Sequence, residues 1–216
     1  MSANSYSTRK EGSGTVADRM VRTLRKRPRQ QRSRVTVDRI VDAAARVLTE
    51  HGYDGTSTNA IARRAGLSPG SLYQYFADKD AVVSAVLERF VQTLLEVVTP
   101  SRSSMSATHQ EQFGAQVLRV MEVLESQQAL LRVLINEVPR LGPDDARDVL
   151  NRRVFDGFRH VVASSAGSDE EHYARSWVAS TLARTVLVRY VLDGPEFSSQ
   201  QLIAAMATAL SGLIES

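Results

Sequence analysis

The residues best suited to chemistry are the hydroxyl and amide side chains between residues 68 and 79. Serine and tyrosine hydroxyls can donate to phosphate oxygens, and the amide of Gln74 can face a base edge. Pro69 and Gly70 have little side chain, so the backbone there can approach closely, and no carboxylate precedes Asp78. We therefore expect this segment to contact DNA. The expected contact residues are Ser57, Thr58, Ser68, Pro69, Gly70, Ser71, Tyr73, Gln74, Tyr75 and Lys79.

Local signals predict that two short helices joined by a tight turn position these groups. Thr56 or Ser57 can cap the first helix, and Gly66 suits the left-handed residue that ends it. Ser68 is a second N-cap, and Pro69 fills the first helical position, where a missing N–H costs nothing. Helix, glycine-containing turn and helix together indicate a helix-turn-helix, whose second helix lies in the DNA major groove.

The second helix has one side for the core and one for a partner. Leu72 and Phe76 are four residues apart and should be buried against the first helix. An alternative interpretation is that Tyr73 and Tyr75 only flank this small core, and that Lys79 is a solvated charge. The complete array of caps, turn and aromatic residues favours the DNA-contacting interpretation.

The segment from Arg39 to Arg89, with its motifs EHGYDGTS and AGLSPGSLYQYFADKD, resembles the TetR family of bacterial transcriptional regulators. The resemblance implies an all-α homodimer with an N-terminal DNA-binding domain and a C-terminal domain that binds a small inducer and dimerises. Ser57 and Thr58 would then begin the positioning helix, residues 68–75 would form the reading helix, and Lys79 would contact a phosphate. Most members are repressors that the ligand releases from DNA. Beyond Arg89 the resemblance is architectural only.

The composition and the charge distribution agree with a nucleic-acid-binding protein that has a second function in its acidic C-terminal part. Residues 1–90 hold 16 Lys or Arg against 9 Asp or Glu, whereas residues 91–216 hold 11 against 15. A basic head on an acidic body is the electrostatic pattern of such a protein. The absence of cysteine excludes disulfides and thiolate metal sites and fits the cytoplasm, where we expect the protein. No apolar run is long enough for a membrane helix, and no secretory signal is present.

We expect three parts: a disordered basic arm (1–34), a helix-turn-helix domain (35–80) and a helical ligand-binding and dimerisation domain (81–216), which 81–98 connects to the head. The arm's arginines either order on DNA or form a solvated tail. The first folded helix should run from Val37 to His51, and a polar break should fall at 99–108. In the body we expect a central buried helix at 129–138 and a helix starting at Pro143 or Asp144. The last two helices should span about 169–192 and 198–214.

Five body residues are candidates for a ligand pocket. They are Phe155, Phe158, Trp177, Thr181 and Arg184. Aromatic walls with a few polar anchors are typical of small-molecule sites. The alternative is a core aromatic cluster with an arginine that bridges subunits.

No pattern indicates an enzyme. The four histidines lack ligand spacing, so we expect no metal site, and no phosphate loop or nucleophile elbow is present. We therefore expect no cofactor. The leading hypothesis is a ligand-responsive repressor that binds a palindromic operator as a homodimer through its last two helices. The alternatives are an activator of the same fold, a helical binding module without DNA binding and, for the terminal helices, burial within one monomer.

Overall fold

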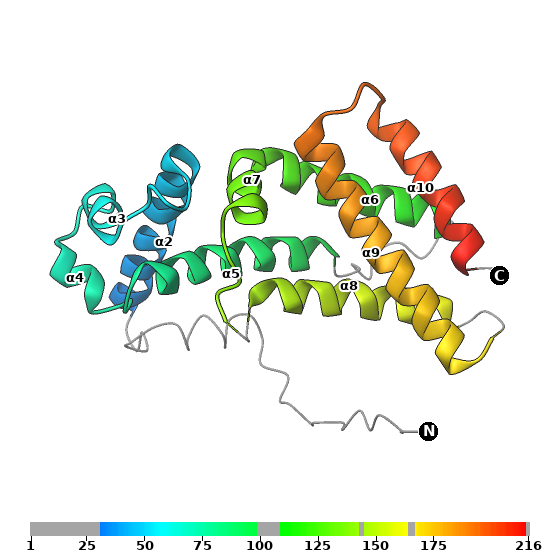
Figure 1. Cartoon of the computed structure of the whole chain (residues 1–216), viewed down its shortest axis with the longest axis horizontal. Coiled ribbons are helices and arrows are strands. Elements are labelled where there is room, and N and C mark those ends of the chain that lie inside the picture. Colours follow the sequence, from blue (N-terminus) through cyan, green and yellow to red (C-terminus); the bar gives the residue numbers. More distant parts are fainter. Residues whose placement is uncertain (1–30, 99–108, 143–144, 164–166, 215–216) are drawn as a thin grey trace.

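A computed structural model describes residues 31–98, 109–142, 145–163 and 167–214. Every regular element in these ranges is an α-helix (Figure 1). The helices are α2 (Gln31–His51), α3 (Thr58–Arg64), α4 (Pro69–Tyr73), α5 (Lys79–Val98), α6 (His109–Ser126), α7 (Gln128–Asn136), α8 (Ala146–Val162), α9 (Asp169–Asp193) and α10 (Ser199–Ile214). The expected all-α fold, with a helix-turn-helix before a helical body, is confirmed.

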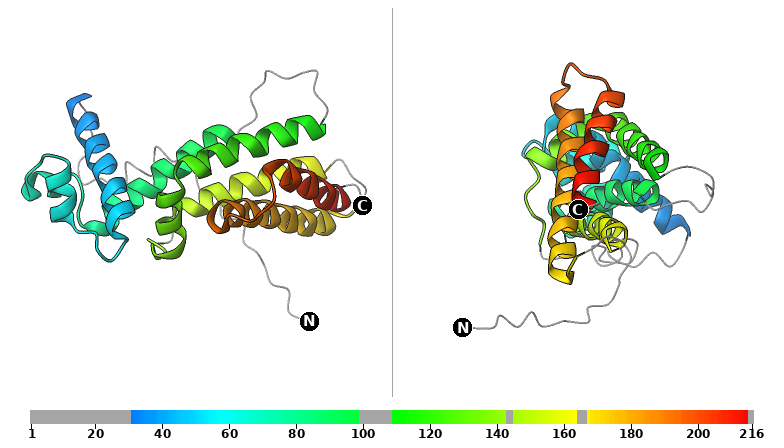
Figure 2. Two further views of the ribbon diagram at one scale, coloured as in Figure 1. Left: turned by 90° about the horizontal axis from the view of Figure 1, so that it is seen from above. Right: turned by 90° about the vertical axis from the view of Figure 1, so that its right-hand side faces the viewer.

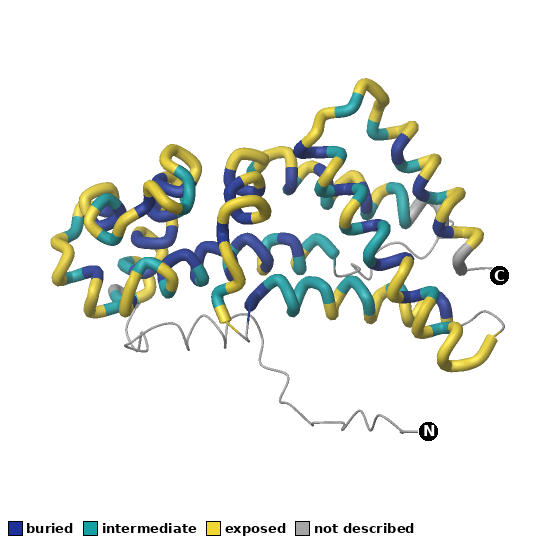
Figure 3. Tube along the Cα trace, viewed as in Figure 1, coloured by how far each residue is buried: buried dark blue, intermediate teal, exposed yellow. Residues whose placement is uncertain are grey.

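The molecule is elongated, with α2, α3 and α4 forming a head at one end and the remaining helices forming a body (Figures 1 and 2). α5 begins in the head, where it packs on α2, and continues between α6 and α8. Its buried stripe includes Val82, Val86, Phe90 and Leu94. Figure 3 shows buried positions continuing along α5 from head to body, so the two parts share one core.

In the body, α9 packs along α8, and α10 lies on α6 and α9. α9 begins with a capping box, in which Ser168 and Glu171 satisfy each other's backbone N–H groups. It ends at Gly194, whose φ of 59° is the left-handed conformation that glycine adopts without strain. The last two helices, expected at about 169–192 and 198–214, are therefore confirmed as α9 and α10 to within one residue at each end.

Several expected boundaries differ from the structure. The first helix starts at Gln31 rather than Val37, so residues 31–34 belong to a helix and not to the arm. The head boundary at residue 80 falls inside the first turn of α5. α8 begins at Ala146 behind an Asp145 cap. The expected helix starts at Pro143 and Asp144, the arm up to residue 30 and the break at 99–108 lie outside the described residues.

The prediction of a central, buried helix at 129–138 is wrong in part. Leu131 and Leu134 are buried, but Ile135 is 46% exposed and Ala129 is exposed. α7 packs against α2 and lies where the head meets the body (Figure 1). An almost wholly apolar sequence does not show which side of a helix faces solvent. No helix in the described ranges is long and apolar enough to cross a membrane.

Candidate nucleic-acid interface and ligand cavity

Two serine caps set the geometry of the helix-turn-helix. The hydroxyl of Ser57 accepts the Ala60 N–H at 3.2 Å, and that of Ser68 accepts the Ser71 N–H at 3.1 Å. Between these caps, Gly66 has a φ of 65°, which turns the chain after α3. The sequence signals for both caps and the turn are thus confirmed, and α4 is presented as a short helix at the tip of the head (Figure 1).

One side of α4 is fully buried and the other is open. Leu72 and Phe76 have no exposed surface, whereas Tyr73 is 41% exposed and Gln74 is exposed. The Tyr73 hydroxyl lies 2.9 Å from Oγ1 of Thr58, which joins the two helices across their exposed sides. Tyr73, Gln74 and Thr58 therefore form a contiguous polar surface.

Tyr75 and Lys79, two other expected contact residues, have roles inside the head. Tyr75 is half-buried and packs against the core. The Lys79 ammonium donates to the Tyr53 carbonyl at 3.2 Å and lies 3.9 Å from the centroid of the Tyr53 ring. An ammonium has three donors, so Lys79 keeps others for a phosphate while it holds the turn after α2.

The Tyr53 hydroxyl completes this cluster. It donates to Oδ1 of Asp80 at 2.6 Å, and this hydrogen bond, together with burial, raises the pKa of Tyr53 to about 12. The phenol therefore stays protonated at physiological pH. Asp80 lies in the first turn of α5, so the cluster ties the start of α5 to the turn between α2 and α3.

Two arginines of the folded head connect α2 with α3. Arg39 donates to the Ala65 carbonyl at 2.5 Å, at the end of α3, and Arg64 forms a two-pronged pair with Glu50 at 2.6 and 2.8 Å. Residues 31–90 hold 8 Lys or Arg against 7 Asp or Glu, whereas residues 1–30 hold 8 against 2. The net positive charge of residues 1–90 thus lies almost entirely in the first thirty residues.

A contact between body and head was not found from the sequence. Oε2 of Glu137, the residue that ends α7, accepts the Tyr53 N–H at 2.8 Å. The neighbouring Gly52 has a φ of 69°, and a Cβ at this position would lie 2.4 Å from the same carboxylate oxygen. Because 84 residues separate Glu137 from Tyr53, no spacing in the sequence indicates this contact.

Behind Glu137, α8 holds the end of α7. The Arg147 guanidinium donates to the carbonyls of Leu134, Val138 and Pro139 at 3.3, 3.2 and 2.7 Å. Asp145 is wholly buried and accepts from Nη2 of Arg147 at 2.6 Å. The first turn of α8 therefore fixes the segment that carries Glu137.

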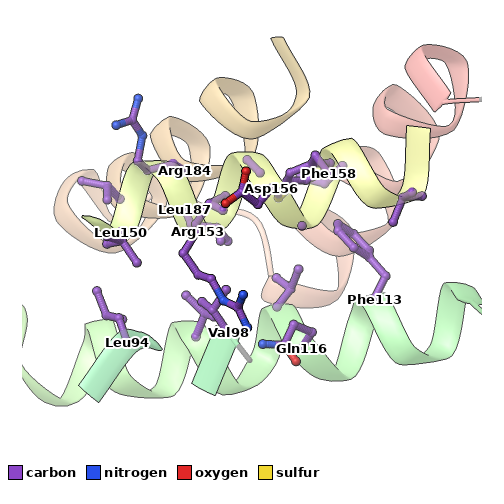
Figure 4. A pocket seen from close by; sticks show the side chains of 18 of the residues that line it. Leu94, Val98, Phe113, Gln116, Leu150, Arg153, Asp156, Phe158, Arg184 and Leu187 are labelled. Carbon is purple, nitrogen blue, oxygen red and sulfur yellow. The ribbon is translucent and has the colours of Figure 1, made fainter. Parts of the chain in front are cut away.

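The more apolar of two cavities in the described body, the main cavity, lies among α5, α6, α8 and α9 (Figure 4). Its volume is about 520 Å³, within the range of small-molecule sites. Leu94, Val98, Phe113, Leu150, Phe158 and Leu187 are among its apolar walls. Of the five expected pocket residues, Phe158 and Arg184 line this cavity.

The other expected pocket residues lie elsewhere. Phe155, Trp177 and Thr181 line a second, more polar hollow between α8 and α9, which Arg184 also borders. Trp177 is 57% exposed, so it is not part of a core aromatic cluster. Arg184 donates to Oδ1 of Asn151 and points away from the main cavity (Figure 4). The proposed set is thus divided between two neighbouring hollows, with Phe158 in the main cavity and Phe155 in the hollow between α8 and α9.

The fold and the head define a class: all-helical proteins with an N-terminal helix-turn-helix and a C-terminal helical body. Residues 40–86 match the sequence model of bacterial regulatory proteins of the tetR family. Among solved structures, a tetR-family transcriptional regulator from Streptomyces coelicolor aligns with a TM-score of 0.69 at 16% identity, over 83% of this chain and 80% of that one. The fatty acid degradation regulator FadR from Bacillus halodurans aligns with a TM-score of 0.58 at 19% identity, over 81% and 93%. These two structures establish the fold.

Each of the curated relatives matches only part of this chain. The HTH-type transcriptional regulator UidR of Escherichia coli K12 is 31% identical over 106 residues, which cover 44% of this chain and 53% of UidR. The A-factor receptor protein of Streptomyces griseus is 38% identical over 66 residues, 31% of this chain and 24% of the receptor. The match thus spans about half of one relative and a quarter of the other. Residues 40–86 thus carry the TetR-family DNA-binding domain, and the chain has the fold of TetR-family regulators.

Proposed function

We propose that this protein is a ligand-responsive, DNA-binding transcriptional regulator that acts as a repressor. The observation that carries the proposal is the exposed polar surface of α4, where Tyr73 and Gln74 stand beside Thr58 on a helix anchored by Leu72 and Phe76. Backbone N–H groups at the start of α4 add donors for a phosphate. The names of UidR and the A-factor receptor agree with a regulatory role but do not transfer a ligand or an operator.

A homodimer through α9 and α10 would place two copies of α4 on successive major grooves, so the operator should be close to palindromic. Tyr173, Trp177 and Val178 of α9 are exposed. On α10, Leu202, Met206 and Leu210 are buried within the monomer, while Ala204, Ala205 and Ala209 are exposed. Large apolar groups on α9 and small residues on α10 together support close packing with a second copy.

The route from ligand to DNA would run through α8 and α7. α8 lines the cavity, Asp145 and Arg147 hold the end of α7, and Glu137 holds the turn at Tyr53. A ligand changes this arrangement only if it binds one head position better than the other. Converting a 99:1 mixture to 1:99 requires about 5.5 kcal/mol of differential binding.

The test is to select bound duplexes from a random pool with the purified full chain and then to measure affinities for the enriched site. We expect a palindromic site. Gln74→Ala and Tyr73→Ala should weaken binding by about tenfold, since a good base contact contributes about 1–3 kcal/mol. Gln92→Ala, an equally exposed glutamine on α5, is the control and should bind as the unaltered protein does.

Three further measurements complete the test: folding of the variants, the salt dependence of DNA binding, and reporter expression. Circular dichroism shows whether each variant is folded. Phosphate contacts make affinity fall steeply with salt, by a log–log slope of about 0.9 per neutralised phosphate. A chain that enriches no sequence, or that binds equally well without Gln74 and Tyr73, does not use α4 to read DNA. Reporter expression with the enriched site in a promoter distinguishes a repressor from an activator.

A further inference from the structure

The main cavity has one feature that its apolar walls do not explain: a cationic side chain that extends into it. Arg153 is exposed to solvent as a whole residue, but its side chain leaves α8 and reaches toward Val98 and Gln116 on the opposite wall of the cavity (Figure 4). No hydrogen bond or ion pair of Arg153 is found within the described part of the chain. Arg64, Arg89, Arg140, Arg147 and Arg189, by contrast, all pair with carboxylates.

Neighbouring polar groups do not satisfy this arginine. Gln116 already donates its amide to the Val97 carbonyl, and its side-chain oxygen accepts from Arg119 at 2.5 Å. Arg184 is turned away toward Asn151. Asp156 stays close to α8 and does not reach across the cavity as Arg153 does (Figure 4). The guanidinium is therefore a cationic group without a carboxylate partner among the described residues, and it faces a molecule entering between α8 and α6, in a cavity whose polar lining also includes Asp156 and His160.

We infer that the cavity binds an amphipathic monoanion, with its apolar body among Leu94, Phe113 and Leu187 and its carboxylate or equivalent head on Arg153. This inference rests on the proposed role of the cavity as the inducer site. Apolar walls favour a hydrocarbon body because burial removes apolar surface from water. A planar guanidinium matches a carboxylate through two parallel hydrogen bonds, which a neutral alcohol cannot reproduce.

The test compares three probes of equal chain length and different head group: decanoate, decanol and decylamine. Each is titrated calorimetrically into the purified full chain without DNA, below the concentration at which it aggregates. We expect decanoate to bind about tenfold more tightly than decanol, because a hydrogen bond to a charged group contributes about that factor. Decylamine should bind more weakly than decanol, since Arg153 repels it.

Variants assign the preference to one side chain. Arg153→Gln should bring decanoate down to the affinity of decanol, and Arg153→Lys should restore part of the difference. Arg159→Gln is the matched control, because Arg159 is exposed on the same helix and lines neither hollow. Arg152→Gln tests the second hollow, which Arg152 borders. Circular dichroism verifies that each variant is folded.

The inference fails if decanoate does not bind, if decanol or decylamine binds as tightly, or if Arg153→Gln keeps the preference for the anion. Loss of the preference in Arg152→Gln rather than Arg153→Gln would place the anion in the other hollow and also overturn it. Because these titrations contain no DNA, they do not depend on the proposed function. Anion binding that leaves operator affinity unchanged would count against ligand-responsive regulation, while the ligand class would stand.

Discussion

Glu137 accepts the backbone N–H of Tyr53 at 2.8 Å, and this hydrogen bond joins the C-cap residue of α7 in the body to the turn between α2 and α3 in the head. Gly52 makes the approach possible, because a side chain there would collide with the carboxylate. The turn is also held from the α5 side by Lys79. The turn is therefore held from two directions, by Glu137 at the end of α7 in the body and by Lys79 at the start of α5 in the head.

Removal of the Glu137 carboxylate should loosen the turn at Tyr53 without unfolding the head. In Glu137→Ala we expect faster hydrogen exchange at the Tyr53 amide and little change in α3, whose caps are intact. Mass-spectrometric hydrogen exchange measures both. Glu125→Ala, an exposed glutamate on α6, is the control. Unchanged exchange at Tyr53 would show that Glu137 does not anchor the turn.

Stability should fall at high pH through Tyr53. The phenol has an ordinary pKa of 10.0, and its hydrogen bond to Asp80 raises the folded-state pKa to about 12. The folded state thus favours the protonated form, so its stabilising contribution is present below pH 10 and is lost as the pH rises toward 12. Tyr53→Phe should cost about 1 kcal/mol at neutral pH. Urea unfolding at several pH values tests this.

The matched control for Tyr53→Phe is Tyr173→Phe. Tyr173 is 58% exposed on α9, and its hydroxyl has no hydrogen bond within the described residues. Its removal should leave the high-pH profile as it is. If both variants lose the same part of the alkaline dependence, the bond between Tyr53 and Asp80 is not its cause.

The buried ion pair of Asp145 and Arg147 should dominate the loss of stability at low pH. Burial alone would raise the pKa of Asp145, but hydrogen bonds from Arg147 and from the Leu141 N–H outweigh it and hold the pKa below the ordinary 3.8. This contribution is present above that pH and is lost as the pH falls through the folded-state pKa. Asp145→Asn should cost about 3 kcal/mol, because it leaves a half-buried guanidinium without its anion.

Asp148→Asn is the control for Asp145→Asn, since Asp148 pairs with a largely exposed Arg140. Exposed pairs contribute about 0–1 kcal/mol, so this variant should unfold at nearly the same urea concentration as the unaltered chain. Equal losses in the two variants would contradict a special role for Asp145.

The N-terminal thirty residues should supply most of the electrostatic attraction to DNA. They hold 8 Lys or Arg against 2 Asp or Glu, while residues 31–90 are nearly balanced. Deletion of residues 2–30 should weaken binding to random duplex and flatten its salt dependence, because fewer counterions are released. Fluorescence anisotropy across a salt series measures both. An unchanged slope would place the phosphate contacts in the folded head.

Dimer formation should depend on the small residues of α10. Ala205→Glu adds a charge on an exposed position and should yield a monomer of normal helicity. Ala115→Glu makes the same change at an exposed alanine of α6 and should remain dimeric. Sedimentation velocity distinguishes these outcomes. A variant at residue 205 that stays dimeric would exclude this part of α10 from the interface.

Local signals in the sequence were sufficient for the head. Serine caps, a glycine turn and the spacing of Leu72 and Phe76 act within a few residues of one another, so they predict α3 and α4 correctly. The packing of the body is harder to predict from the sequence, because its helices are amphipathic or wholly apolar and carry no such motifs. The apolar sequence at 129–138 favours a central helix, whereas α7 lies at the junction with α2.

The sequence by itself determined the helical class, the two short helices of the head and their exposed polar face, because each depends on neighbouring residues. Only helix packing shows which hollow each aromatic residue of α8 lines, that the Arg153 side chain reaches across an apolar cavity and that Glu137 meets Tyr53. These relationships join residues far apart in the chain. Their geometry follows from how whole helices pack, which no local spacing encodes.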